Sequence, residues 1–111
     1  MCGILACFSK KMISKHDFTD ALFKMQHRGP DDYGLWYSEK DSVWLGHVRL
    51  STIGLANGKQ PLIDADNKII AIVNGEFYDY KSIRSELVAK GYIFKTDTDS
   101  EILIPLYLEY N

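Results

Sequence analysis

The stretch Met1-Cys2-Gly3-Ile4-Leu5-Ala6-Cys7-Phe8 opens the chain and decides how the rest of the sequence is interpreted. The apolar run of residues 4–8 is typical of a short buried strand. Cys2 stands directly before that run. If Met1 is removed, Cys2 carries both a thiol and a free α-amine, so a nucleophile there brings its own general base. The stretch therefore predicts a strand with a catalytic cysteine at its start, and the alternative is that a cysteine follows Met1 by accident.

Length and composition bound the possible functions. The chain has 111 residues, a net charge of -2 and 46% hydrophobic residues, which suits one soluble domain with a modest core. Charges of both signs are mixed along the chain, so we expect no nucleic-acid partner and no membrane partner. No segment has the length or the flanking residues of a membrane span or a secretory signal, which makes a cytoplasmic protein the expectation.

The two cysteines do not form a disulfide framework. Cys2 and Cys7 lie five residues apart, and on a strand they would point to opposite faces, which argues against pairing or shared metal ligation. We expect Cys7 to be a buried structural thiol. No set of residues resembles a metal site.

The first half of the chain predicts one helix and two paired strands. Ser14 and Asp17 have the spacing of a capping box, and an apolar stripe at helical spacing follows them. That stripe consists of Phe18, Ala21, Leu22 and Met25. Residues 35–38 and 43–50 then predict a strand pair, and residues 52–60 a loop.

The second half predicts two strands and two helices. Residues 64–67 indicate a turn, and the continuously apolar residues 68–73 a strand buried on both faces. Residues 80–90 predict a helix that ends at Gly91, with Ile83, Leu87 and Val88 turned inward. A short strand over residues 92–95 precedes the last helix, which Thr98 and Glu101 open as a capping box and Pro105 kinks.

Six short segments, taken together, resemble the glutaminase domain of class II glutamine amidotransferases of the asparagine synthetase type. In chain order they are Met1-Cys2-Gly3-Ile4, His27-Arg28-Gly29-Pro30-Asp31, His47-Val48-Arg49-Leu50-Ser51, Gln60-Pro61-Leu62, Asn74-Gly75-Glu76 and Thr98-Asp99-Ser100-Glu101. Pro30 after Arg28-Gly29, and Leu50-Ser51 after Arg49, favour this branch over the amidotransferases of sugar-phosphate amination or purine synthesis. The resemblance covers the whole chain.

The resemblance implies an α+β fold that is part of an N-terminal nucleophile hydrolase αββα sandwich with antiparallel sheets. Residues 1–111 would be the N-terminal portion of the amidotransferase domain, truncated or split, because such domains continue with further strands and then an ATP-using synthetase domain. We therefore expect uncovered apolar strands and a complementing chain, a synthetase subunit or a homo-oligomer as partner. No cofactor is expected in this chain, since ATP and Mg²⁺ would serve only the synthetase domain.

The resemblance also implies a role for each site residue. Cys2 would attack the side-chain amide of L-glutamine, and Asn74 and Gly75 would form the oxyanion hole. Arg49 would bind the substrate α-carboxylate, and Asp99 and Glu76 its α-ammonium. The product would be glutamate, with ammonia passed to an asparagine-synthetase-like partner.

Each site residue also has an ordinary structural explanation. Arg49 lies between apolar neighbours and could pair with an internal carboxylate. Asn74-Gly75 could be a turn at a strand end, and Asp99 could stabilise a helix start. His27, Arg28 and Asp31 are expected to shape a loop beside the site and His47 to lie in the core or a loop. The alternative function is a non-catalytic assembly or glutamine-sensing module that keeps the fold.

Overall fold

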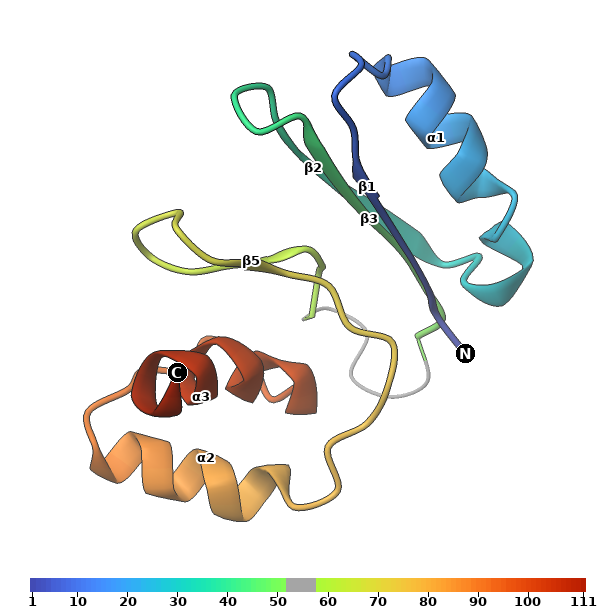
Figure 1. The fold of residues 1–111 in the computed structure, drawn as a ribbon. Coiled ribbons are helices and arrows are strands. Elements are labelled where there is room, and N and C mark those ends of the chain that lie inside the picture. Colours follow the sequence, from blue (N-terminus) through green and yellow to red (C-terminus); the bar gives the residue numbers. More distant parts are fainter. Residues whose placement is uncertain (52–57) are drawn as a thin grey trace.

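The computed structural model describes residues 1–51 and 58–111, so most of the predicted loop over residues 52–60 lies outside the described residues. The first half contains β1 (Gly3–Phe8), α1 (Lys15–Phe23), η1 (Gln26–Arg28), β2 (Asp32–Ser38) and β3 (Val43–Arg49). The second half contains β4 (Leu62–Ile63), β5 (Ile70–Ala71), α2 (Tyr80–Ala89), η2 (Asp99–Ile102) and α3 (Leu103–Tyr110). Figure 1 shows the two halves as separate layers, with α1 on the outer side of the first sheet.

The first half is an antiparallel sheet in the order β1-β3-β2. Gly3 pairs with Val48 across β1 and β3, and the predicted strand pair forms between β2 and β3. The central strand β3 is the most buried element, since five consecutive residues, 44–48, are buried. The expected α+β class with antiparallel sheets is confirmed, consistent with a fragment of an αββα sandwich.

Helix α1 packs against one face of this sheet. Ser14 caps the helix as predicted, with its hydroxyl oxygen accepting the backbone N–H of Asp17 at 3.0 Å. Phe18 stacks on Trp44 of β3 with ring centroids 5.2 Å apart, and Leu22 is fully buried. The apolar stripe is therefore core, except that Ala21 is exposed.

Helices α2 and α3 lie together in the second half (Figure 1). Gly91 adopts a φ of 98° and ends α2 as predicted. Leu87 is buried, but Val88 is 53% exposed, so its predicted inward position is wrong. Pro105 is the third residue of α3, where a backbone N–H has no partner within the helix, so the proline interrupts no hydrogen bond of α3.

Two strand predictions are wrong: one strand is much shorter than predicted, and the other does not form. The predicted strand over residues 68–73 is reduced to the two residues of β5, which are half-buried. Asp64 accepts the N–H groups of Lys68 and Ile69 at 2.6 and 2.8 Å, and Gln60 accepts that of Val73 at 2.7 Å. Side chains therefore occupy the backbone donors at both ends of the apolar run, which leaves a short ladder between them.

Residues 92–95 form no strand, for a similar reason. The carboxylate of Glu101 accepts the backbone N–H groups of Lys95 at 2.6 Å and Thr96 at 2.8 Å, while Tyr92 bonds back to Leu87 of α2. The Glu101 side chain therefore binds backbone groups that precede its own helix. The predicted capping box is wrong as well, because Thr98 occupies the N-cap position of η2 without a side-chain capping bond.

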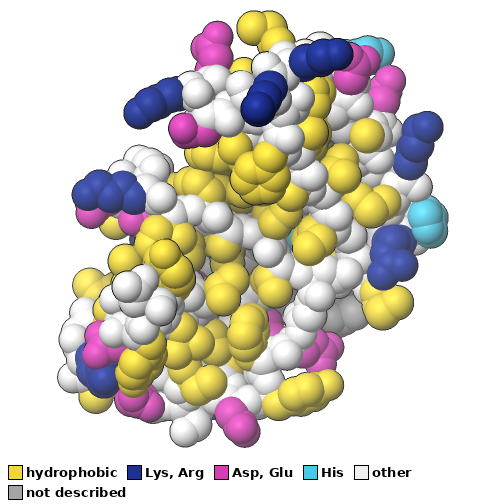
Figure 2. Space-filling model, viewed as in Figure 1, with side chains coloured by type: hydrophobic (Ala, Val, Ile, Leu, Met, Phe, Trp, Pro, Cys, Tyr) yellow, Lys and Arg dark blue, Asp and Glu magenta, His cyan; other side chains and the backbone are white. Residues whose placement is uncertain are grey.

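Apolar side chains are also exposed in both halves. Ile4 is 42% and Phe8 75% exposed on β1, and Leu108 and Tyr110 of α3 are more than half exposed. Figure 2 shows hydrophobic side chains gathered across the middle of the face seen in Figure 1 and over the helical half. No helix in residues 1–51 and 58–111 is long and apolar enough to cross a membrane.

Candidate functional site

Cys2 lies at the start of β1, beside the end of β3. The strand register pairs Gly3 with Val48, which brings Cys2 next to Leu50. The backbone N–H of Leu50 donates to Sγ of Cys2 at 3.4 Å, and Sγ lies 3.9 Å from the Leu50 carbonyl oxygen. Cys2 is half-buried and is a free thiol. A backbone N–H aimed at the sulfur is suited to stabilise negative charge there.

The loop of residues 27–31 fixes the backbone around this cysteine. Arg28 donates from Nε to the carbonyl of Cys2 at 3.1 Å, and the backbone N–H of Asp31 donates to the carbonyl of Arg49 at 3.0 Å. The Asp31 carboxylate accepts the N–H of Ser51 at 2.7 Å. The loop therefore ties the first strand to the end of β3, as expected for a loop beside the site.

Gly29 allows this loop to lie directly on β3. A Cβ atom at Gly29 would come within 2.6 Å of backbone atoms of Val48 and Arg49. Any residue larger than glycine would therefore clash with β3. His27 belongs to the end of the preceding helical segment, since its ring Nδ1 lies 3.1 Å from the carbonyl oxygen of Lys24.

Arg49 approaches the start of η2. A Cβ atom added at Gly58 would meet the methyl group of Thr98 at 2.7 Å and a guanidinium nitrogen of Arg49 at 3.4 Å. The guanidinium group and the residue that precedes Asp99 therefore border the same small volume. This places Arg49 on the side of the sheet that faces the second half of the chain.

Asp99 connects η2 to the segment that precedes α2. Its two carboxylate oxygens accept the backbone N–H of Phe77 and of Ser100, each at 2.8 Å. Asp99 therefore has a structural role, because it joins the start of η2 to the segment before α2. The Ser100 hydroxyl also donates to the Asp99 carboxylate, at 3.4 Å. A carboxylate offers about four acceptor positions, so these three bonds leave capacity for one donor of an ammonium group.

Asn74, Gly75 and Glu76 form an exposed segment between β5 and α2. A Cβ atom at Gly75 would meet nothing within 4 Å, so its backbone lies open. The residue before this segment, Val73, is held by Gln60 through the 2.7 Å bond to its N–H. A hydrogen bond also joins His47 to the backbone of Val73.

His47 is a core residue of β3, 2% exposed. Burial, and then the positive charge of Arg49, lower the pKa of His47, while its hydrogen bond to Val73 and the Asp32 carboxylate act in the opposite direction. Nε2 is buried and finds no hydrogen-bond partner among the described residues. A neutral imidazole is therefore favoured at the point where β3 meets Val73.

The predicted residues thus form two connected groups. Cys2 is bonded to the ends of β3 and η1, and the segment around Asn74 and Gly75 is bonded to Gln60, His47 and Asp99. In the described residues, the hydrogen bonds of Cys2 go to Leu50 and Arg28, not to Asn74 or Asp99. His47 and Arg49, two residues apart on β3, are the link between the groups. The individual roles of the six site residues remain predictions.

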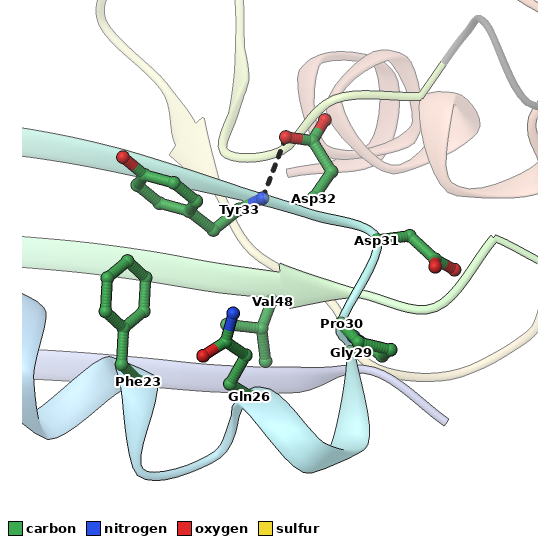
Figure 3. Close-up of a pocket in the computed structure, with 8 residues that line it drawn as sticks. All are labelled: Phe23, Gln26, Gly29, Pro30, Asp31, Asp32, Tyr33 and Val48. Carbon is green, nitrogen blue, oxygen red and sulfur yellow. Dashed lines mark hydrogen bonds between the residues drawn. The ribbon is translucent and has the colours of Figure 1, made fainter.

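Two cavities are lined by residues other than the six predicted ones. One, of about 200 Å³, lies between η1 and the start of β2 and includes Gln26, Asp31 and Tyr33; Figure 3 shows Phe23 beside Tyr33 there, with Asp31 near the end of β3. The other, of about 440 Å³, lies between β5 and α3. Residues 1–51 and 58–111 contain no group of three or more His, Cys, Asp or Glu side chains placed to hold a metal ion.

Sequence reasoning missed the part that Gln60 and the Leu50 N–H play. Gln60 was recognised only as part of a motif, although a polar side chain beside a proline at the end of a loop is available to bind a neighbouring backbone. The Leu50 N–H carries no side-chain signal and follows only from the strand register.

The model of the glutamine amidotransferase domain family matches residues 1–111. Asparagine synthetase [glutamine-hydrolyzing] 1 of Bacillus subtilis is 41% identical over 115 residues, covering 99% of this chain and 18% of the relative. A probable asparagine synthetase [glutamine-hydrolyzing] of Dictyostelium discoideum is 42% identical, covering 96% and 20%. Amidase chry2 of Gibberella zeae is 48% identical over 91 residues, covering 81% and 13%. The chain spans about a fifth or less of the length of these relatives.

Proposed function

Because the chain belongs to the glutamine amidotransferase domain family, we propose that it is the glutaminase part of an amidotransferase of the asparagine synthetase type. It hydrolyses L-glutamine to glutamate through a thioester on Cys2. The ammonia then passes to an ATP-dependent amide-forming synthetase, either in the same protein or as a partner. The observation that carries the proposal is the contact of the Cys2 sulfur with the Leu50 N–H, next to Arg49.

Removal of Met1 is the step that creates the nucleophile. Met1 is 77% exposed, so the residue to be removed is accessible to an aminopeptidase. Once freed, the α-amine of Cys2 takes the thiol proton, and the sulfur attacks the side-chain amide carbon of glutamine. The C–N bond breaks, the amine returns the proton to the leaving nitrogen, and ammonia leaves. Water then cleaves the thioester to glutamate and the free thiol.

The remaining site residues bind the substrate and stabilise the intermediate. Arg49 pairs with the α-carboxylate of glutamine, and Asp99 with Glu76 receives its α-ammonium, which holds the amide at Cys2. The Asn74 side chain and the Gly75 N–H stabilise the negative oxygen of the tetrahedral intermediate. Removal of one such donor typically lowers the rate by about 10² to 10³.

The first prediction tests the nucleophile with a matched control. In the full-length protein, Cys2→Ala should reduce glutamate release from glutamine to background, because no other thiol is held at the site. Cys7→Ala should retain most activity, since Cys7 is also a half-buried free thiol on β1 but lies at the other end of the strand. Mass spectrometry of the active protein should show an N-terminus at Cys2.

Turnover that survives Cys2→Ala, or an active protein that keeps Met1, would contradict the proposal. Glutamine binding without any turnover in a protein that begins at Cys2 would instead support a glutamine-sensing module.

A further inference from the structure

The segment of Asn74 and Gly75 is exposed and is held mainly at its two ends. The oxyanion hole that we assign to these residues requires donors placed to within tenths of an ångström, because it must match the oxygen of the intermediate. The groups that hold the ends of the segment therefore decide whether the hole is formed.

The entrance of the segment is held from the first sheet. Val73 donates its backbone N–H to Oε1 of Gln60 at 2.7 Å, and the ring of His47 on β3 is hydrogen-bonded to the backbone of the same residue. At the exit, Asp99 accepts the N–H of Phe77 at 2.8 Å. Val73 is thus the last residue before the predicted donors that is tied to the sheet carrying Cys2.

Gln60 itself is seated on that sheet. A Cβ atom at Gly34 of β2 would lie only 1.7 Å from the carbonyl oxygen of Gln60 and 3.2 Å from Pro61. The backbone of Gln60 therefore rests directly on β2 where the strand has no side chain. The sheet therefore sets the position of Gln60, and the hydrogen bond of the Gln60 side chain in turn sets the position of Val73.

We propose that Gln60 is a positioning residue for the oxyanion hole. Its side-chain carbonyl fixes Val73 relative to the first sheet, and so sets where the Asn74 amide and the Gly75 N–H lie relative to Cys2. This role rests on the proposed glutaminase function. The side chain contributes an acceptor to a half-buried N–H that would otherwise be left unpaired, and it touches no reacting atom.

The test compares three variants of the full-length protein. Gln60→Leu keeps the side-chain size but removes the acceptor, so kcat for glutamine hydrolysis should fall by about 10- to 100-fold, as expected for a shift of about 1 Å or less at the reacting centre. KM should change little, because Arg49 and Asp99 are untouched. Gln60→Glu keeps an acceptor for the Val73 N–H and should restore most of the lost kcat. Gln26→Leu, at an exposed glutamine outside the site, should have no effect.

Two further measurements separate positioning from general damage. The Val73 amide should exchange with solvent faster in Gln60→Leu than in the wild type and Gln60→Glu. Alkylation of Cys2 by iodoacetamide, which needs no oxyanion hole, should keep its rate in all three variants.

An active wild type whose Gln60→Leu variant keeps its kcat would overturn the role of Gln60 alone. Equal losses in Gln60→Leu and Gln60→Glu, or unchanged exchange at Val73, would do the same. A wild type that releases no glutamate from glutamine would overturn the proposed function and this role with it.

Discussion

The two halves of the molecule are held together in different ways. In the first half, β1, β3 and β2 form an antiparallel sheet in which β3 is bonded on both sides, and α1 covers one face. Residues 60–102 contain only a two-residue strand pair before their helices. Here the connecting segments are fixed by side chains that bind backbone groups: Gln60, Asp64, Asp99 and Glu101 as acceptors, and Arg84, which donates to the carbonyl of Thr96.

This difference corresponds to the division of the proposed chemistry. Cys2, the proposed nucleophile, and Arg49, the proposed carboxylate-binding residue, lie at strand ends of the first sheet, where many hydrogen bonds fix their position. The proposed oxyanion residues and Asp99 lie on segments that depend on one or two side chains each. We therefore expect core substitutions to act on the first half globally and polar substitutions to act on the second half locally.

The largest expected effect is from a substitution in the core of the first half. Leu22 of α1 is fully buried and lies against Gly46 of β3, so Leu22→Ala should lower the free energy of unfolding by about 2 to 5 kcal/mol. Leu108→Ala is the matched control, because Leu108 is 51% exposed and should change stability by less than about 0.5 kcal/mol. Urea unfolding followed by tryptophan fluorescence measures both, since Trp44 stacks on α1 through Phe18. Equal losses for the two leucines would show that the burial of Leu22 against β3 is not what stabilises the first half.

A smaller and more local effect is expected in the second half. Glu101 accepts the N–H groups of Lys95 and Thr96 and also the hydroxyl of Thr96. Glu101→Gln keeps the shape but removes the charge and one acceptor oxygen, so the loss should be about 1 to 3 kcal/mol. Hydrogen exchange should rise at residues 95 and 96 and stay unchanged in β3.

Glu39→Gln, at an exposed position before β3, serves as the control for charge removal and should leave exchange unchanged throughout. If Glu101→Gln instead raises exchange across the first sheet, the two halves do not respond separately.

The same difference explains what could be predicted from the sequence. The strand pair of β2 and β3 and the cap of α1 at Ser14 follow from local patterns, and the structure confirms them. The strands expected over residues 68–73 and 92–95 were wrong because Asp64, Gln60 and Glu101 take backbone donors that a ladder would use. Such bonds join residues 4 to 13 positions apart and leave no periodic signal in the sequence. The predicted inward position of Val88 was wrong because an apolar residue on a helix is not always turned inward.

The predicted site residues follow the same rule. Arg49 and Cys2 could be placed from strand register, since each stands at the end of an expected strand. The sequence assigns Asp99 to the substrate, and its bond to Phe77 could not be inferred, because it joins the start of η2 to a distant connecting segment through tertiary structure.

The smallest expected effect lies where the halves meet, at His47. The pKa of His47 is lowered from its ordinary value of 6.5 by burial and by Arg49. The unfolded chain therefore binds a proton at a higher pH than the folded chain does. The contribution of His47 to the free energy of unfolding should be complete above about pH 6.5 and should decrease as the pH falls below that value. One proton limits the slope to about 1.4 kcal/mol per pH unit.

Comparison of variants isolates this contribution from that of the carboxylates, which titrate at lower pH. His47→Gln should flatten the slope between about pH 6.5 and 5, whereas His16→Gln, at a histidine whose side chain is 82% exposed, should leave it as in the wild type. A slope that persists in His47→Gln would place the titrating group elsewhere.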